Sequence, residues 1–435
     1  MLVVKFGGTS VANAPALSAT ANVIRRYTQE PGGVIVVLSA TAGTTSALLE
    51  IARMAGSGED HRPILESLIS RHRDLACELV GSSTCIDALC DQCIHYAEAV
   101  ALLGEWNQVT LDGMAAFGEL MSSAILHAML KGNLQASLVD ARDLIITSSI
   151  DGGVDFLATN GACRSHLSPM LQTEQIIVTQ GFIARDAQGR TTTLGRGGSD
   201  YSAAIMGAAM GAREILIYTD VSGVYSADPR IVPDASPLPS ITFELMQEMA
   251  SYGAKVLHPE TITPAVRASI PVRVLNTFSP DDQGTCVTSS SGELLDACAV
   301  TVLRRVELVT GALDTADHLL MQESLRRHIV LTQRTLQGSM TAIHCPEESC
   351  MSELEISLLD QDHQHQAVSM IVVTGCEAHN PDVARMLSSA LAVHVRTALL
   401  IPMSLTCIAA IVDRTAADVC MRALHAAVTR RPDQV

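Results

Sequence analysis

Residues Leu2 to Ser10 read LVVKFGGTS, an apolar run that ends in two glycines and two hydroxyl residues. The run Leu2–Phe6 is typical of a buried strand that passes into a loop. Lys5 would stand at the end of this strand, and Gly7 and Gly8 would let backbone N–H groups approach an anion closely. A phosphate-binding loop is one interpretation, and a tight turn beside a lysine is the other. A Walker A loop is excluded, because the lysine precedes the glycines.

Short apolar runs alternate with helical patterns on the C-terminal side of this loop. Helices are expected over residues 15–27 and 199–211, and over 46–131 with breaks near residues 56–58, 81–83 and 104. Buried strands are expected over 34–38, 175–179 and 214–218, and a hairpin over 182–194. Strands that alternate with helices predict an α/β fold, in which a mainly parallel sheet is sandwiched by helices.

The length and charge of the chain limit its organisation and its partners. A chain of 435 residues is too long for one ordinary core and predicts two or three domains. The formal net charge of −17 argues against nucleic acid and anionic membranes as main partners. No uninterrupted apolar run approaches the roughly 20 residues of a membrane helix, and no signal-peptide pattern follows Met1. We therefore expect a cytoplasmic protein that binds neither nucleic acid nor membrane.

The 12 cysteines are scattered along the chain. Cys85, Cys90 and Cys93 come closest to a cluster, but no second half of a zinc-binding pattern follows them. We expect reduced, mostly buried thiols and no dedicated metal site in the protein. A metal site at this cluster is the alternative.

A change in composition marks the expected domain boundary. Between Ser279 and Glu293, proline, aspartate, glycine and a run of serines replace the regular pattern. We place one domain over residues 1–290 and a second region over 296–435. The second region is long enough for two small α+β units. Its last part predicts strand, helix, strand and helix over 367–373, 381–391, 408–412 and 416–428.

A second glycine loop precedes an alanine-rich helix in the segment TTTLGRGGSDYSAA, Thr191 to Ala204. Its glycines would let the backbone wrap an anion at the helix N-terminus, which Ser199 or Asp200 could cap. Arg196 offers a planar fork suited to a carboxylate. The position between a strand and a helix favours a ligand site, since open α/β sheets bind ligands there. An arginine exposed to solvent is the alternative.

Three further segments carry polar groups that could bind a ligand. Thr219 and Asp220 end an apolar run, and Tyr225 and Arg230 follow them. These residues could hold a purine and its phosphates. The alternative is that they form only an Asx turn and a proline turn. Lys255 is presented by the small-residue segment GAKVLHP. Glu119 stands at the start of an apolar helix, where helix capping is the ordinary role.

The motifs that are missing narrow the chemistry. The sequence contains no G-x-S-x-G elbow, no H-E-x-x-H helix and no G-x-G-x-x-G fingerprint. The candidate functional groups that remain are lysines, glycine loops, one arginine and two carboxylates at defined positions. These groups suit phosphoryl transfer, in which the protein positions the reactants and stabilises charge.

Taken together, the segments resemble the aspartokinases, a branch of the amino acid kinase fold. The matching segments occur in the family's order and cover essentially all of residues 1–290. They are KFGGTS (5–10), SATAGTT (39–45), FGELMS (117–122), TTTLGRGGSDYSAA (191–204), YTDVSGVYSADPR (218–230) and YGAKVLHP (252–259). The resemblance implies transfer of phosphate from ATP to the β-carboxylate of L-aspartate, which gives 4-phospho-L-aspartate. In the family this is the first step toward lysine, threonine and methionine.

The resemblance also implies roles for single residues, with Lys5, Asp200 and Lys255 at the reaction centre. The residues implied for ATP are Lys5, Gly7, Gly8, Ser10, Thr219, Asp220, Tyr225, Arg230, Lys255 and Val256. Those implied for aspartate are Ser39, Thr45, Glu119, Arg196, Gly197, Gly198 and Ser199. Mg²⁺ would be held mainly by the nucleotide phosphates.

Residues 296–435 resemble the family's tandem ACT domains less closely. The segment 367–428 follows the pattern of the second ACT domain, but PMSLTC (402–407) replaces the usual Ser-Ser-Glu run, and the first ACT pattern is not recognisable. We expect ACT-like folding and a homodimer or higher homo-oligomer, with amino acid sensing altered or lost. Two alternatives stay open: a catalytically idle amino-acid sensor, and a kinase acting on another carboxylate.

Overall fold

A computed structural model describes residues 1–148, 152–173, 175–254, 257, 259–289, 298–311, 329–335, 338–345, 363–396 and 398–429. The chain divides into two compact units. The first comprises Met1–Val224, Pro239–Phe243 and Leu257–Ser290, and the second comprises Tyr225–Leu238, Glu244–Val256 and Ser291–Val435. Each unit is described by itself below.

An eight-stranded sheet forms the centre of the first unit, in the order β3-β5-β2-β1-β8-β10-β11-β9. Its strands are β1 (Leu2–Phe6), β2 (Val34–Leu38), β3 (Ala136–Val139), β5 (Ile176–Gln180), β8 (Glu214–Thr219), β9 (Ser240–Thr242), β10 (Val272–Asn276) and β11 (Thr285–Thr288). All neighbouring pairs are parallel except β10 with β11. Every residue of β1, β2 and β5 is buried, so both faces of this part of the sheet are covered. The predicted α/β sandwich is confirmed.

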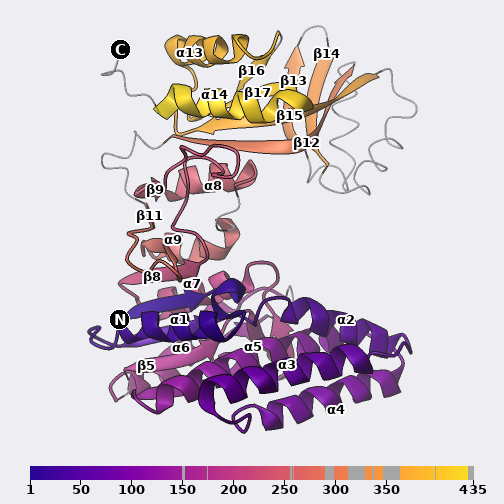
Figure 1. Cartoon of the computed structure of the whole chain (residues 1–435), viewed down its shortest axis with the longest axis vertical. Coiled ribbons are helices and arrows are strands. Elements are labelled where there is room, and N and C mark those ends of the chain that lie inside the picture. The colour runs from indigo at the N-terminus through magenta and orange to yellow at the C-terminus, as the bar shows by residue number, and fades with distance from the viewer. Residues whose placement is uncertain are drawn as a thin grey trace. The chain divides into compact units, whose positions relative to one another are not determined.

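Helices of the first unit pack on this sheet or on one another (Figure 1). They are α1 (Ala14–Arg25), α2 (Thr44–Gly56), α3 (Arg62–Val80), α4 (Asp87–Leu103), α5 (Gln108–Lys131), α6 (Phe156–Met170), α7 (Gly198–Met210) and α9 (Thr263–Arg267). α5 packs against β2, β3 and β5, and α2, α3 and α4 pack around α5. α7 packs against β1, β2 and β8, with α6 and α9 beside it.

The predicted breaks in the long helical stretch are confirmed and have local causes. α3 and α4 end at Gly81 and Gly104, which adopt the left-handed conformation with φ of 77° and 66°. α5 begins at a capping box, in which Asn107 and Thr110 each accept a hydrogen bond from the other's backbone N–H.

The predicted hairpin forms, but outside the main sheet. β6 (Ile183–Asp186) pairs antiparallel with β7 (Thr191–Thr193), and β4 (Ile146–Thr147) completes a three-stranded sheet. The Asp186 side chain closes the turn, since it accepts hydrogen bonds from the backbone N–H groups of Gln188 and Arg190. Strand β3 and helix α6 are not expected from the sequence pattern, because β3 is only four residues long and few residues of either element are buried.

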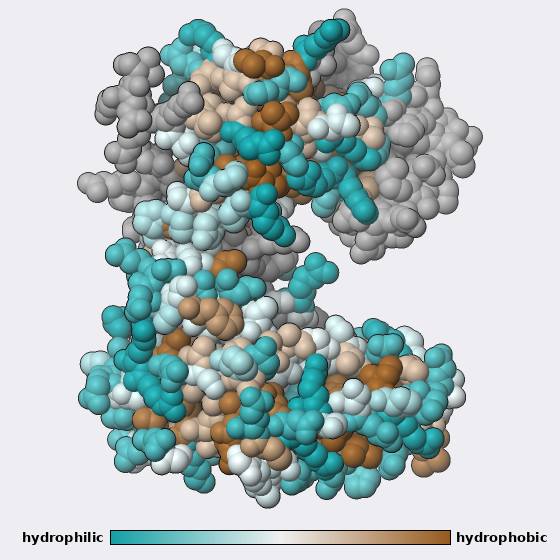
Figure 2. Space-filling view, in the orientation of Figure 1, coloured by the Kyte–Doolittle hydropathy of each residue, from teal (hydrophilic) through white to brown (hydrophobic). Residues whose placement is uncertain are grey.

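α5 is a core helix. Among the described helices it is the one long and apolar enough to cross a membrane by length and composition, yet 78% of its most apolar window is buried. No uninterrupted apolar run marks it in the sequence, because Asp112, Glu119 and small polar residues divide it. On the face shown in Figure 2, hydrophilic and hydrophobic residues are interspersed over the first unit.

The cysteines near α4 are buried in helix packing. Cys90 and Cys93 are free thiols with no exposed surface, and their sulfur atoms lie 4.0 and 3.9 Å from those of Met121 and Met114 on α5. Burial raises the pKa of Cys90 to about 11 and that of Cys93 to about 12. These thiols are therefore apolar packing groups, as the sequence predicted.

A six-stranded antiparallel sheet forms the second unit, in the order β13-β14-β12-β15-β17-β16. The strands are β12 (Ala299–Gly311), β13 (Ile329–Thr335), β14 (Gly338–His344), β15 (His363–Thr374), β16 (Leu399–Pro402) and β17 (Cys407–Asp413). α13 (Pro381–Ala392) and α14 (Ala417–Thr429) lie beside each other over the sheet (Figure 1). The four predicted elements form as β15, α13, β17 and α14, and the additional edge strand β16 was not predicted. This α+β region is ACT-like.

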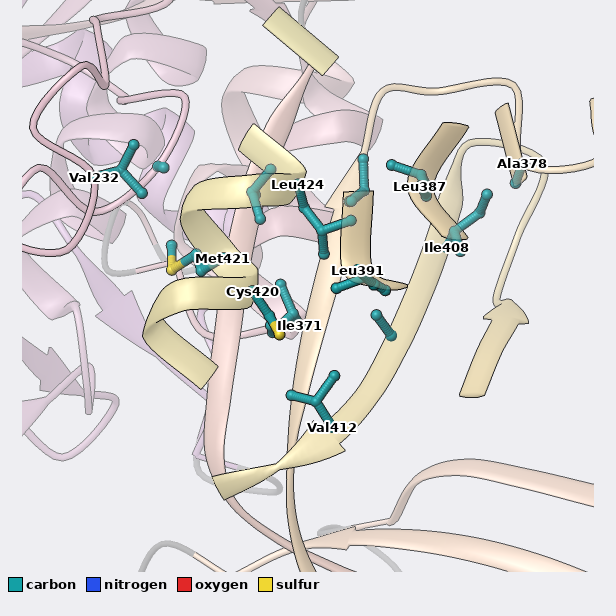
Figure 3. Packing of buried hydrophobic residues seen from close by; sticks show 14 residues of the cluster. Val232, Ile371, Ala378, Leu387, Leu391, Ile408, Val412, Cys420, Met421 and Leu424 are labelled. Carbon is teal, nitrogen blue, oxygen red and sulfur yellow. The ribbon is translucent and has the colours of Figure 1, made fainter. Parts of the chain in front are cut away.

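Residues from before the predicted boundary also belong to the second unit. Val232 packs with Ile371, Leu391, Met421 and Leu424 in one buried cluster of this unit (Figure 3). α8 (Phe243–Ser251) lies mostly within it as well. The segments 225–238 and 244–256 are therefore built into the second unit, although the chain returns to the first unit between and after them.

Candidate active site

Four strands of the first unit bring their carboxyl ends together, where parallel sheets bind ligands. The residue after each of β1, β2 and β5 is fixed to a neighbouring strand by a backbone hydrogen bond. Ser39 donates its N–H to the Phe6 carbonyl at 3.1 Å, Gly181 to Leu38 at 2.7 Å, and Gly7 to Tyr218 at 3.1 Å. The loops after β1, β2, β5 and β8 are thereby held side by side.

A cavity of about 360 Å³ opens between the loops after β1, β2 and β5, α5 and the N-terminus of α7. Its lining residues come from separate parts of the chain and include charged, hydroxyl and glycine residues. They are Lys5, Gly8, Ser39, Ala40, Thr41, Ala42, Gly43, Thr45, Ser46, Glu119, Phe182, Gly195, Gly197, Gly198, Ser199 and Asp200.

An ion pair between Lys5 and Asp200 lies on one wall. The Lys5 Nζ atom is 2.6 Å from an Asp200 carboxylate oxygen, and the two side chains are 10% and 17% exposed. Lys5 comes from β1 and Asp200 from the first turn of α7. The pair holds the ammonium group at the cavity, where it can face an incoming anion.

The N-terminus of α7 reaches the cavity without a side-chain cap. Gly197 is the N-cap residue, with a φ of 70° that favours glycine, and no side chain caps the helix. The expectation that Ser199 or Asp200 caps this helix is wrong, because both lie inside its first turn. The unused N–H groups and the helix dipole favour an anion at this wall.

The turn after β5 packs closely on the start of α7. A Cβ atom at Gly198 would lie 2.7 Å from the Phe182 ring, so glycine is required by the close approach. Phe182 itself adopts a φ of 65°, which is uncommon for a residue with a side chain. The Ser202 hydroxyl accepts a hydrogen bond from the Phe182 N–H and donates one to the Gly198 carbonyl. This bonding fixes Phe182 in the wall of the cavity.

Glu119 places a carboxyl group inside the protein on α5. The residue is 3% exposed. Its carboxyl group accepts a hydrogen bond from the Ala40 N–H, while its Oε2 atom is buried without a hydrogen-bond partner. Burial raises the pKa of Glu119 to about 8. A buried carboxyl oxygen without a partner, lining a cavity, is suited to receive a cationic ligand group.

The three threonines that precede the glycine loop attach it to the rest of the unit. Thr191 receives a hydrogen bond from Arg142 at 3.2 Å, and Thr192 shares one with Thr147 at 3.0 Å. Thr193 donates its hydroxyl to Asp112 on α5 at 2.9 Å. Each residue of β7 is therefore fixed by its side chain to a different element, and the glycine loop begins from a rigid base.

Many of the residues implied by the resemblance line this one cavity. These are Lys5, Gly8, Ser39, Thr45, Glu119, Gly197, Gly198, Ser199 and Asp200.

Three others of the described residues are nearby but do not line it. Arg196 stands between the lining residues Gly195 and Gly197, with its own side chain exposed. Ser10 is fully buried, and its hydroxyl lies 2.7 Å from that of Thr277. Gly7 uses its N–H in the bond to Tyr218.

The residues implied for the nucleotide are distributed more widely. Thr219 and Asp220 stand at the carboxyl end of β8, where the Thr219 hydroxyl bonds the Asp220 carboxylate at 3.0 Å. Tyr225 and Arg230 belong to the second unit, and Arg230 forms a two-point ion pair with Asp228. Lys255 and Val256 lie outside the described residues. No group of three or more histidine, cysteine or acidic residues in the described part of the chain is arranged to hold a metal ion.

Sequence reasoning did not single out Phe182, Thr41 and Ser46 as residues that line the cavity. Thr41 belongs to the small-residue loop after β2, and that position was the available signal. Phe182 carried no signal, since its role depends on a backbone conformation that follows from packing against α7.

Comparison with known proteins identifies the family. Residues 1–276 match the model of the amino acid kinase family. The chain is 36% identical to an aspartokinase of Chlamydia trachomatis over 304 residues, which cover 69% of this chain and 68% of that protein. It is 37% identical to lysine-sensitive aspartokinase 3 of Escherichia coli over 300 residues, 67% of this chain and 65% of that protein.

The solved structures extend the similarity to nearly the whole chain. E. coli aspartokinase III in complex with aspartate and ADP matches 99% of this chain and 100% of that chain, with a TM-score of 0.78 and 28% identity. The chain belongs to the amino acid kinase family and, within it, to the aspartokinases.

Proposed function

We propose that the cavity binds L-aspartate beside the γ-phosphate of ATP. The β-carboxylate of aspartate attacks the γ-phosphorus, and the bond from that phosphorus to the β,γ-bridging oxygen breaks. The products are 4-phospho-L-aspartate and ADP. The observation that carries the proposal is that one cavity is lined by a buried carboxyl group, a lysine ammonium and an uncapped helix N-terminus. The carboxyl group suits the α-ammonium of aspartate. The lysine and the helix N-terminus suit the γ-phosphate of ATP and a carboxylate of aspartate.

Glu119 and Arg196 are proposed to orient the amino acid. The partnerless Oε2 atom of Glu119 supports a hydrogen bond from the α-ammonium group of aspartate. Arg196 is carried by the glycine loop between the lining residues Gly195 and Gly197, and its guanidinium is proposed to bind the α-carboxylate. Ser39, Thr45, Gly197, Gly198 and Ser199 would complete the aspartate site.

No general base is needed for this reaction. The β-carboxylate of aspartate has a reference pKa of about 3.9 and is already ionised at neutral pH. The obstacle is the repulsion between this carboxylate and the polyphosphate. Lys5 and the N-terminus of α7 offset that repulsion within the cavity, and Lys255 is proposed to add a second ammonium group. Asp200 holds Lys5 in place.

The nucleotide is proposed to bind along the carboxyl ends of β1 and β8. Gly7, Gly8 and Ser10 would hold phosphates from the loop after β1. The remaining contacts are assigned to Thr219, Asp220, Tyr225, Arg230, Lys255 and Val256. When bound with ATP, Mg²⁺ supplies positive charge to the phosphate oxygens. The described residues fit an ion held mainly by phosphates, because they offer Asp200 and Asp220 near the site but no cluster of ligands.

Residues 1–290 are proposed as the catalytic domain and 296–435 as the regulatory and dimerisation domain. We propose altered or lost amino acid sensing, because the atypical segment 402–407 is engaged within its own unit. The Ser404 and Thr406 hydroxyls and the Cys407 thiol all bond the Glu248 carboxylate of α8, at 2.7, 2.8 and 2.9 Å. A homo-oligomer and a cytoplasmic location remain predictions. Free buried thiols such as Cys90 and Cys163 support a reducing compartment.

An acyl-phosphate trapping assay tests the reaction. Purified protein with MgATP, L-aspartate and hydroxylamine should release ADP and form aspartyl hydroxamate in equal amounts. Succinate lacks the ammonium group and L-glutamate is one methylene longer, so both should react far more slowly than aspartate. Turnover with another acid but not with aspartate would identify a different carboxylate kinase. No turnover with any of these acids would favour an idle sensor.

A further inference from the structure

We propose that Arg71 and His72, on α3, are positioning residues of the aspartate site. They act through Thr41, in the loop between β2 and α2, and Thr44, the first residue of α2. The inference rests on the proposed function, since it assigns the loop to aspartate binding. Neither residue lies within a segment that resembles the family, and neither lines the cavity. What points to them is a continuous chain of side-chain hydrogen bonds from α3 to the cavity wall.

The hydrogen-bond chain from α3 to the cavity wall has four bonds. The Arg71 guanidinium lies 2.6 Å from the Thr44 hydroxyl, which lies 2.5 Å from the Thr41 hydroxyl. The Thr41 hydroxyl lies 3.1 Å from His72 Nε2, and His72 Nδ1 lies 2.8 Å from the Leu68 carbonyl. His72 and Thr44 have no exposed surface, and Thr41 is 3% exposed. Water therefore has little access to the inner bonds.

The direction of the bonds follows from the Leu68 end of the hydrogen-bond chain. The Leu68 carbonyl can only accept, so His72 donates to it from Nδ1. Burial lowers the pKa of His72 to about 4, so the imidazole is neutral and its Nε2 atom accepts the single proton of the Thr41 hydroxyl. Thr41 then accepts a hydrogen bond from Thr44, and Thr44 accepts one from Arg71, which can only donate.

The loop after β2, which this hydrogen-bond chain holds, forms one side of the cavity. Ala40, Thr41, Ala42, Gly43, Thr45 and Ser46 all line it. The Ala40 N–H also bonds the Glu119 carboxyl group. The loop contains small side chains and a left-handed glycine, Gly43, with a φ of 76°. Ala40 and Thr44 pack against Gly118 on α5, and the buried bonds from Thr41 and Thr44 to α3 add side-chain restraints that help to fix the position of the Ala40 N–H and of Thr45.

Kinetic comparison of three variants tests this assignment. His72→Leu removes the acceptor for Thr41, and we expect the KM for aspartate to rise about tenfold while the KM for ATP and kcat change less than threefold. His72→Gln keeps an acceptor near the Nε2 position and should restore at least half of the loss in KM. His127→Leu is the matched control, because His127 also bonds a carbonyl in the first unit, that of Ala136, but lies away from the cavity. It should leave both KM values unchanged.

A double-mutant cycle and hydrogen exchange separate positioning from general destabilisation. Thr44→Val breaks the same chain, so combining it with His72→Leu should raise the KM for aspartate little beyond the single variant. Amide exchange of residues 39–46 should accelerate at least about tenfold in His72→Leu and not in His127→Leu. The exchange measurement needs no turnover, so it decides the inference even if aspartate proves not to be the substrate. Unchanged exchange in this loop, or equal losses in both KM values, would overturn it.

Discussion

Replacing Glu119 by glutamine is expected to stabilise the ligand-free protein increasingly as the pH rises above about 4.5, while weakening aspartate binding. The pKa of Glu119 is about 8 in the folded protein, against an ordinary value of 4.5. Between these values the folded state binds more protons than the unfolded state, so stability falls as the pH rises from about 4.5 to 8. The difference corresponds to about 5 kcal/mol at most. Glutamine keeps the shape and carries no charge, so it removes this loss.

The assay is chemical unfolding of wild type and Glu119→Gln at several pH values between 4.5 and 9. The free energies of unfolding should be similar near pH 4.5 and should diverge in favour of the variant up to about pH 8. Glu66→Gln is the control, since Glu66 is exposed on α3, and it should follow wild type at every pH. Parallel curves for Glu119→Gln and wild type would refute the reasoning.

The same variant should bind aspartate poorly. Losing a buried carboxylate–ammonium pair costs about 3 kcal/mol, which is roughly a hundredfold in affinity. In wild type, Glu119 must give up its proton to pair with the α-ammonium, so the KM for aspartate should fall as the pH rises from 6 to 8. A KM that Glu119→Gln leaves unchanged would remove Glu119 from the aspartate site.

The other expected outcomes concern the neighbouring residues and the second unit. Lys5→Ala should lower kcat at least about a hundredfold, with a smaller effect on aspartate binding, because the charge it supplies matters most in the transition state; unchanged kcat would exclude it from the reaction centre. Arg196→Ala should raise the KM for aspartate at least about tenfold and leave the KM for ATP nearly unchanged, and equal losses in both would contradict the assignment. Thr193→Val should lower the free energy of unfolding by about 1–3 kcal/mol, since Asp112 loses a buried donor, and should raise the KM for aspartate severalfold; denaturant unfolding and initial rates measure the two effects. Thermal-shift titration with lysine, threonine and methionine should show no stabilisation, and a saturable shift with any one of them would indicate retained sensing.

The elements that the sequence predicts well are those with a local signal. β1, β2, β5 and β8 are apolar runs bounded by glycine or polar residues, and the breaks at Gly81 and Gly104 are left-handed helix ends. β3 and α6 carry weak patterns and form because the sheet and α7 supply their partners. The small sheet β4-β6-β7 could not be foreseen, because a two-residue strand has no periodicity.

The site is predicted unevenly for a similar reason. Lys5, Glu119 and the glycine loop stand in segments whose residue types suggest their chemistry. Arg71 and His72 lie in an ordinary amphipathic helix, and their link to Thr44 and Thr41 depends on how α3 packs beside α2. The boundary between the units was also hidden, because Val232 joins the second core through a turn that precedes the composition change.

A crystal structure with L-aspartate, Mg²⁺ and a non-hydrolysable ATP analogue would test the central claim most directly. The account predicts the α-ammonium of aspartate within about 3 Å of the Glu119 carboxylate. It also predicts the β-carboxylate facing the γ-phosphate beside Lys5 and the first turn of α7. An amino acid bound away from Glu119, or a γ-phosphate outside the reach of Lys5, would contradict it.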